Sequence, residues 1–419
     1  MRSIGYFVLV TVALPWAVQA NPVIYVAPSG QDSPSSGTET QPFRTITAAL
    51  RTNPTPGVVI QLAPGNYTAD SGETFPLQLP RGVVLRGNEQ GKGQGVVISG
   101  GGFFVSPTFA RQNVAILAND NAQIRGITLV NNAKRGYGVW VESAQNVAIV
   151  NNTFTDTAHD GVFLTGKASA NILGNVFTKN RASGLSAVGE STGEIRENIF
   201  EDTGFGLSVG QKSAVTIVNN RIINNRAGIV LSNLATPKIR GNLIANSRED
   251  GLVILKDRSG QPNPDLGTAA DPGGNVFQNN RQRDINNASG VTLSAFGNQL
   301  DPQKVLNVSL SGTLAPTPSP SVPLVVERPS APPQALPPTA PAVRPPSSSA
   351  GGVFRFRVFV PIESADRTAQ LRRLVPDAFV TMRNGRRVFQ VGAYRDRSEA
   401  DAQAQRLREA GFISTIEGS

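Results

Sequence analysis

The sequence predicts an all-β right-handed parallel β-helix with coils of about 22 residues, followed by a small α+β C-terminal domain. Three observations predict this architecture. An Asn recurs once per coil, a Gly recurs at a second position of the same coils, and residues 353–419 show the order βαββαβ.

The Asn column gives the length of one coil. Successive residues are 23, 23, 22 and 22 positions apart, and the last step of 33 contains an insertion. An Ile lies three residues before each of the first five, and a Phe or Ile lies two residues after all six. A spacing of this size is typical of a solenoid. The column consists of Asn152, Asn175, Asn198, Asn220, Asn242 and Asn275.

The Gly column marks a second strand of each coil. Aliphatic residues follow each Gly at the first and third positions, such as Val162 and Leu164 after Gly161. Apolar residues at spacing two, in short runs, indicate strands with one buried face. The Leu-x-x-Leu-x-Leu pattern of leucine-rich repeats is absent, and helical repeats need longer units. The column consists of Gly138, Gly161, Gly184, Gly206, Gly228 and Gly251.

We expect a structural role for the Asn column. Asn tolerates the left-handed conformation that a turn between two sheets requires. Stacked coils lie about 4.8 Å apart, so equivalent Asn side chains can hydrogen-bond along the stack. A ligand-binding role is the alternative. A second polar column follows five residues later, at Thr157, Asn180, Thr203, Asn225, Ser247 and Asn280.

The N-terminal residues indicate export. Residues 1–20 read as a signal peptide, with Arg2, an apolar run from residue 4 to 18, and a small-residue cleavage site ending at Ala20. The apolar run is short for a membrane span, so we expect no stable span after cleavage. The absence of cysteine agrees with a periplasmic or cell-envelope location. We expect the β-helix at 21–312, a capping helix within Gln41–Leu50, and the first coil strand from Val58.

The start of this region resembles a known group. It carries Tyr25-Val26-Ala27-Pro28-Ser29-Gly30, then Gln41-Pro42-Phe43-Arg44-Thr45-Ile46, then Pro64-Gly65-Asn66-Tyr67. These segments resemble the N-terminal signature of a pectin-lyase-like family of unknown function. The resemblance implies the β-helix fold and leaves the chemistry open, because fold does not fix function.

A linker and a second domain follow. Residues 313–352 are rich in Pro and Ser, which favours an extended spacer. The expected βαββαβ elements are Val353–Val360, Ser364–Leu374, Ala378–Met382, Arg387–Tyr394, Ser398–Ala410 and Phe412–Ile416.

The segments Phe389–Tyr394, Arg397–Ala400 and Leu407–Phe412 are similar to the SPOR (sporulation-related) family. This resemblance implies binding to septal peptidoglycan, especially glycan strands without stem peptides. The first half departs from the family, because residues 354–361 contain no clear Gln-x-Gly-x-Phe copy. Strand alternation would put a candidate peptidoglycan site on the open sheet face, at Arg355, Arg357, Gln390 and Tyr394.

The charge is compatible with a polymer partner. The net charge is +9, and basic residues occur in both domains. Nucleic acid is the usual alternative partner of a basic protein, but export argues against it. We therefore expect peptidoglycan or another polysaccharide as the partner. The sequence indicates no cofactor and no metal site.

Candidate catalytic residues are few. The one histidine, His159, precedes Asp160 in the turn before Gly161, and the two form a weak catalytic candidate. Trp140 and Phe163 should be neighbours in adjacent coils. They could stack against sugars beside Asp160, or they could form a structural surface patch covered by a loop. Asp250 is four coils away, roughly 19 Å, too far to pair with Asp160 in glycoside hydrolysis.

Three function classes stay open at this point. The first is a non-catalytic envelope protein that binds carbohydrate through both domains, and we favour it. The second is a wall-targeted polysaccharide lyase or hydrolase. The third is a structural or interaction solenoid.

Overall fold

The structure is a computed structural model that describes residues 21–310, 356–361, 367, 370–371, 375, 379–383, 386–394 and 397–418. The chain divides into two compact units, described separately here. The expected signal peptide, the linker at 313–352 and Arg355 lie outside the described residues.

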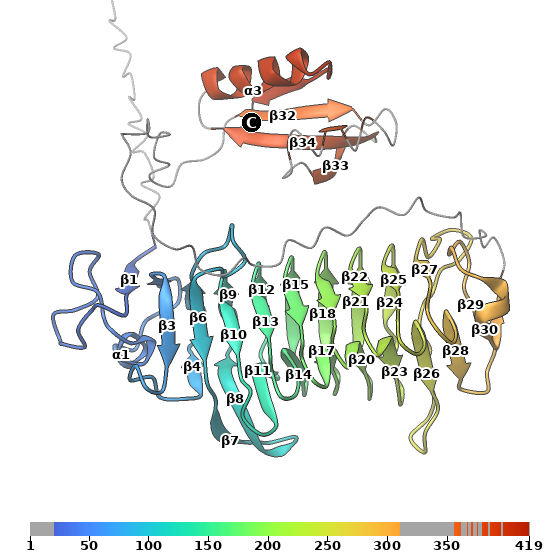
Figure 1. Ribbon diagram of the computed structural model, residues 1–419, viewed down its shortest axis with the longest axis horizontal. Coiled ribbons are helices and arrows are strands. Elements are labelled where there is room, and N and C mark those ends of the chain that lie inside the picture. The colour runs from blue at the N-terminus through green and yellow to red at the C-terminus, as the bar shows by residue number, and fades with distance from the viewer. Residues whose placement is uncertain are drawn as a thin grey trace, which may run out of the picture. The chain divides into compact units, whose positions relative to one another are not determined.

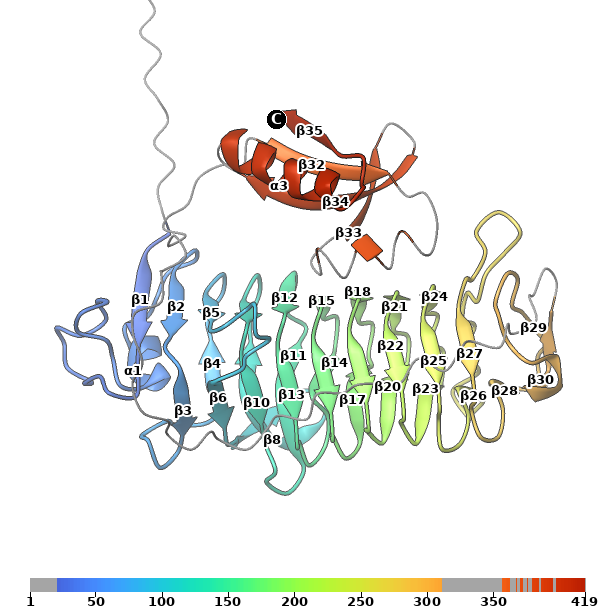
Figure 2. The ribbon, with the colours of Figure 1, turned by 45° about the horizontal axis from the view of Figure 1, so that its top comes forward.

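The first unit is a right-handed parallel β-helix of about 11 turns. Each coil adds one strand to each of three parallel sheets, and the coils follow one another along the axis (Figures 1 and 2). The Ile149 and Phe154 columns point inward and are fully buried. Both columns were predicted to form the core, and the structure confirms this.

Sheet A begins each coil. Its strands are β1 (Val23–Val26), β2 (Val59–Leu62), β5 (Val84–Arg86), β9 (Gln123–Arg125), β12 (Val147–Val150), β15 (Ser169–Leu173), β18 (Thr192–Arg196), β21 (Ala214–Val218) and β24 (Lys238–Arg240).

Sheet B carries the Phe154 column. Its strands are β3 (Gly65–Thr68), β6 (Val96–Ser99), β10 (Thr128–Val130), β13 (Thr153–Thr155), β16 (Val176–Thr178), β19 (Ile199–Glu201), β22 (Arg221–Ile223), β25 (Leu243–Ala245) and β27 (Val276–Gln278).

Sheet C contains most of the Gly column, and β7 (Gly102–Ser106) pairs antiparallel with one of its strands. Its strands are β4 (Leu77–Leu79), β8 (Ala110–Ala118), β11 (Gly136–Glu142), β14 (Val162–Thr165), β17 (Ser183–Ala187), β20 (Phe205–Val209), β23 (Ala227–Leu231), β26 (Leu252–Leu255), β28 (Ile285–Ala288) and β30 (Val305–Leu306).

The Asn column forms the expected ladder between sheets A and B. Each side-chain Nδ2 donates to Oδ1 of the Asn in the next coil at 2.8–3.0 Å, and the ladder extends to Asn298. The expectation that these Asn are left-handed was wrong. The residue before each is left-handed instead, such as Asn151 with φ 53° and Glu197 with φ 57°. The ladder Asn residues therefore contribute side-chain hydrogen bonds, and the residue before each of them adopts the left-handed conformation of the turn.

The N-terminal end is closed by helix α1 (Ile46–Arg51), which begins later than the expected 41–50. Thr45 is its N-cap and accepts from the Ala48 N–H. The Glu73 carboxylate accepts from the Ile46 and Thr47 N–H groups at 2.7 and 2.9 Å. The first strand is β1, which pairs with β2 and precedes the strand expected from Val58.

The insertion after β26 packs back on sheet A. The backbone of Asp265 forms an isolated parallel β-bridge with that of Lys238. The Arg240 guanidinium binds the carboxylates of Asp265 and Asp271 at 2.6 and 3.1 Å. Beyond it lie the 3-10 helix η1 (Pro302–Lys304) and the paired strands β29 (Leu293–Ser294) and β31 (Val308–Ser309).

The second unit contains a four-stranded antiparallel sheet of order β33-β34-β32-β35. Helix α3 packs on three of these strands, and the core includes Phe389, Val391 and Leu407. Burial of Phe389 and Val391 agrees with the predicted strand alternation. The bounds are β32 (Phe356–Pro361), β33 (Phe379–Arg383), β34 (Arg386–Tyr394), α3 (Arg397–Glu409) and β35 (Thr415–Gly418).

Candidate functional site

His159 and Asp160 lie in the turn that enters β14. The His159 Nδ1 is 3.2 Å from Asp160 Oδ1, and their side chains are 34% and 2% exposed. The Tyr137 ring stacks on the imidazole with centroids 4.4 Å apart. Burial, followed by the charge of Asp160, raises the pKa of Tyr137 to about 12. The three side chains thus form a compact cluster in which only the imidazole has substantial access to solvent.

Asp160 has a structural task that the sequence did not reveal. Its Oδ1 accepts from the Ser183 N–H of the next coil at 2.9 Å. Asp250, in the equivalent turn further along, accepts from the Arg283 N–H at the same distance. Two Asp residues in the same turn position therefore satisfy the same kind of buried backbone donor. This shared role favours turn stabilisation over chemistry.

Trp140 and Phe163 are neighbours, as expected. They pair in register between β11 and β14, and their rings stack at 4.3 Å. Of the two alternatives, the structure shows the covered patch and not an open platform, because the side chains are only 1% and 7% exposed. Phe104 and Phe109, from the β7–β8 hairpin, pack edge-on against Trp140 at 5.5 and 6.1 Å. Asp160 is also buried, so none of the three candidate carbohydrate residues lies on the surface.

Polar contacts hold this hairpin in place. The Trp140 Nε1 donates to Glu142 Oε2 at 3.1 Å. The other oxygen of Glu142 accepts from the backbone N–H and the hydroxyl of Thr108, in the hairpin turn, at 3.0 and 2.8 Å. The aromatic cluster is thus a small second core between the hairpin and sheet C.

A row of Arg residues in the turn between sheets B and C is the feature that our sequence analysis missed. Each member donates its backbone N–H to a carbonyl of the preceding coil, so the members stand in register. Gly204 occupies one position of the row and has no side chain. The row is Arg181, Gly204, Arg226, Arg248 and Arg281. The signal was present, because four of these residues directly follow the second polar column as Asn-Arg or Ser-Arg.

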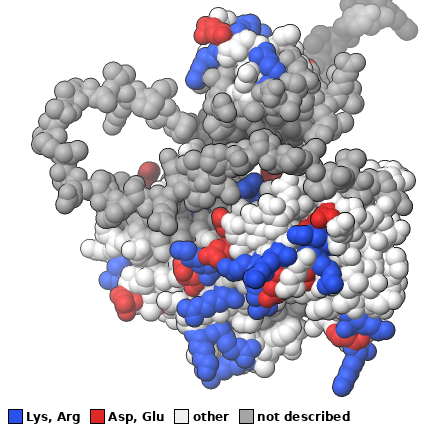
Figure 3. All heavy atoms as spheres, turned by 45° about the vertical axis from the view of Figure 1, so that its right-hand side comes forward, with Lys and Arg blue, Asp and Glu red and all other residues white. Residues whose placement is uncertain are grey.

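A hollow of about 570 Å³ opens over the first four members of this row, and we call it the basic groove. Four of its side chains are cationic and one is a carboxylate. Lys and Arg side chains gather on the face of the β-helix that Figure 3 presents, with Asp and Glu among them. The groove is lined by Lys179, Asn180, Arg181, Asp202, Thr203, Gly204, Arg226 and Arg248.

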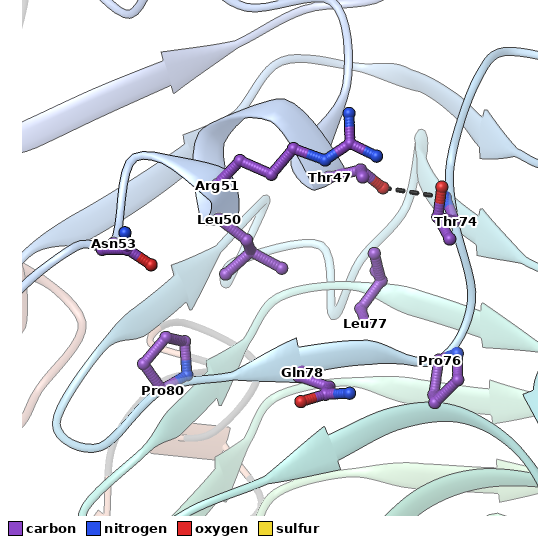
Figure 4. A pocket seen from close by; sticks show the side chains of 9 residues that line it. All are labelled: Thr47, Leu50, Arg51, Asn53, Thr74, Pro76, Leu77, Gln78 and Pro80. Carbon is purple, nitrogen blue, oxygen red and sulfur yellow. Dashed lines mark hydrogen bonds between the residues drawn. The ribbon is translucent and has the colours of Figure 1, made fainter. Parts of the chain in front are cut away.

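A second hollow, of about 410 Å³, lies between α1 and β4 (Figure 4). Arg51 is its one charged lining residue. The Thr47 hydroxyl on its wall accepts from the Thr74 N–H at 2.8 Å and donates to Glu73 at 2.6 Å. This hollow therefore belongs to the packing of the capping helix, and we assign it no ligand.

Within the described part of the chain, no group of three or more His, Asp or Glu side chains is placed to hold a metal ion. No helix in that part is both long and apolar enough to cross a membrane.

The expected peptidoglycan site lies on the central strands of the second unit. Arg357 is in β32, and Gln390 and Tyr394 are in β34, which pairs with β32. The backbone pairs Phe356 with Tyr394 and Phe359 with Gln390, with a register shift between Val358 and Phe359. The backbone thus brings these three positions onto neighbouring strands. Their side chains lie outside the described residues.

Comparisons with known proteins identify a family whose function is unknown. Residues 28–305 match the profile of a family described as "Protein of unknown function (DUF1565)". No curated protein matches the chain. The matched residues cover most of the β-helix and none of the second unit.

Solved structures similar to the chain include pectate lyase Pel9A, with 14% identity, a TM-score of 0.48, and coverage of 73% of this chain and 83% of that one. A lacto-N-biosidase from Eubacterium ramulus has 14% identity, a TM-score of 0.46, and coverage of 70% and 67%. A polygalacturonase from Erwinia carotovora has 13% identity, a TM-score of 0.43, and coverage of 72% and 99%. Similarities of this level do not assign an activity to the chain.

Proposed function

The chain belongs to DUF1565, a family of unknown function. We propose, from the residues of the chain itself, that it is an exported cell-envelope protein that binds carbohydrate polymers. In this proposal the β-helix presents one polymer-binding face, and the SPOR-like C-terminal domain binds peptidoglycan. The signal-peptide pattern at residues 1–20 supports export to the periplasm or envelope.

The observation that carries the proposal is the basic groove. It crosses four successive coils, because Lys179 and Arg181 lie in one coil, Asp202 and Gly204 in the next, and Arg226 and Arg248 in the two after that. A site that repeats with the coils suits a ligand that repeats as well. Carbohydrate polymers have such repeats, and their hydroxyl groups hydrogen-bond to planar donors such as guanidinium groups.

The favoured role is binding without catalysis. Asp160 and Tyr137, which would have to serve as catalytic groups beside His159, are buried and 1% and 4% exposed. The second candidate is a wall-targeted lyase or hydrolase, and one observation favours it. His159 is partly exposed, and its Nδ1 lies 3.2 Å from a carboxylate oxygen without a hydrogen bond between them. A histidine general base would need the two groups to align.

Peptidoglycan binding can be tested on the second unit, which has its own hydrophobic core. The experiment is pull-down of the 353–419 fragment by purified sacculi, beside an Arg357→Ala, Gln390→Ala, Tyr394→Ala variant. We expect the wild-type fragment to sediment with sacculi and the variant to stay in solution. Equal sedimentation of both would remove the proposed site, and sedimentation of neither would refute peptidoglycan binding.

A charge-matched control changes helix α3 instead of the sheet. Arg408→Ala removes one positive charge, as Arg357→Ala does, from an exposed position near the end of the helix. This control should sediment like the wild type. If it also stayed in solution, general charge attraction would explain the binding better than a defined site.

A further inference from the structure

We infer that the basic groove binds an anionic polysaccharide whose chain runs along the β-helix axis, with its acidic groups held by cations from three of the four coils that the groove crosses. This inference rests on the proposed carbohydrate-binding function and names the chemical class of the polymer. The shared chemistry is an acidic group on each repeat, either a carboxylate or a phosphate.

The spacing of the cations favours a polymer over a small anion. Coils of the β-helix are about 4.8 Å apart, so Arg181 and Arg248, three coils apart, are separated by roughly 14 Å at the backbone. One sugar ring of an extended polysaccharide advances by a length similar to one coil. An extended chain can therefore follow the coils without bending, and acidic groups on its sugars can meet the cations of the first, third and fourth coils.

The charge balance of the groove favours an anion. Its lining has the cations Lys179, Arg181, Arg226 and Arg248 against the single carboxylate of Asp202. Among the described residues, no carboxylate forms an ion pair with Lys179 or Arg181. These two side chains are exposed and available to a ligand.

The other two cations are held by exposed contacts. The Arg226 guanidinium lies over the Phe205 ring, 4.4 Å from its centroid, and Arg248 donates to the Thr203 carbonyl at 3.5 Å. Arg226 lies 3.8 Å from Glu249, and Arg248 lies 3.4 Å from Asp202, and all four side chains are about half exposed. Exposed ion pairs of this kind contribute little to stability, so an acidic ligand can replace the carboxylates. A guanidinium group also matches a carboxylate or phosphate with two parallel hydrogen bonds.

The backbone prepares the groove before a ligand arrives. The N–H groups of the row are bonded to the preceding coils at 2.9–3.1 Å, which fixes the spacing of the side chains. Gly204 leaves room in the middle of the row, and a Cβ there would come within 2.2 Å of the Ala182 carbonyl oxygen. The hollow is thus a consequence of close backbone packing at one coil.

The test measures binding of the mature full-length chain to soluble probes by titration calorimetry at low salt. The probes are polygalacturonate for carboxylates, dextran phosphate for phosphates, neutral dextran, and a single-stranded DNA oligonucleotide. The groove variant is Arg181→Ala, Arg226→Ala, Arg248→Ala. The control variant is Arg51→Ala, Arg81→Ala, Arg258→Ala, which removes the same charge from other exposed positions of the β-helix.

We expect at least one acidic glycan to bind, dextran not to bind, and the groove variant to bind about tenfold or more weakly than the control variant. The stronger of the two acidic probes identifies the source of the charge. Equal affinity of the two variants would overturn the site while leaving carbohydrate binding intact. Preference for dextran would overturn the anionic class, again without refuting the proposed function.

Two further outcomes would also be decisive. DNA binding as tight as glycan binding, and lost in the groove variant, would overturn the assignment to a polysaccharide. Failure of all three glycans would overturn the inference together with the β-helix part of the proposed function. Circular dichroism of both variants, expected to match the wild type, separates lost binding from lost folding.

Discussion

Phe177→Ala should be among the most destabilising single changes in the β-helix. Phe177 is fully buried and stacks between Phe154 and Phe200, with ring centroids 4.9 and 4.6 Å away and interplanar angles of 11° and 6°. Removing a buried Phe side chain costs about 3–5 kcal/mol of unfolding free energy. We expect a value near the upper end, because the Gly161 and Gly184 backbones beside the ring are fixed by the coil hydrogen bonds and cannot fill the cavity.

The assay is urea unfolding of residues 21–419, followed by far-ultraviolet circular dichroism. Phe154→Ala is a matched variant, because its ring stacks on one Phe only and has Leu129 on the other side. It should lose about 0.5–1.5 kcal/mol less than Phe177→Ala. Phe103→Ala, at a position 59% exposed, should stay within about 1 kcal/mol of the wild type. A loss below about 2 kcal/mol for Phe177→Ala would refute the packing argument.

His159→Ala should fold with nearly unchanged stability, whereas Asp160→Ala should lose about 1–3 kcal/mol because the Ser183 N–H loses its acceptor. Asp160→Asn keeps an acceptor oxygen and should lose less in the same urea assay. Degradation of a polysaccharide by the wild type, abolished in His159→Ala, would contradict a role without catalysis. The stability that the Arg240–Asp265 ion pair contributes, at the insertion after β26, should also depend on pH. Burial opposes the effect, but hydrogen bonds from Arg240 hold the pKa of Asp265 below its usual 3.8. Because the folded-state pKa is depressed, this stabilisation is present above pH 3.8 and disappears as the pH falls through the folded-state value. Urea midpoints of wild type and Asp265→Asn should therefore differ at about pH 6, and the difference should shrink as the pH falls below 3.8. A constant difference would contradict this account.

The candidate site was only partly predictable from the sequence. Strand periodicity placed Trp140 and Phe163 side by side, because residues at equivalent coil positions become neighbours. The sequence did not decide between an open platform and a covered patch, because the β7–β8 hairpin that covers them interrupts the repeat. The basic groove is the opposite case. Its Arg residues recur at coil spacing, but they are hard to distinguish from the other Arg residues of the sequence. They become apparent only when each is seen to follow directly a residue of the second polar column.

The sequence by itself determined the coil period, the inward Ile and Phe columns and the Asn ladder. Each of these depends on residues at a fixed spacing, and a stacked structure turns sequence spacing directly into spatial contact. Only the tertiary structure decided which surface positions are covered and which are open. Coverage depends on segments outside the repeat, such as the hairpin over Trp140, and on the absence of a side chain at Gly204. Such effects arise between coils and have no period of their own in the sequence.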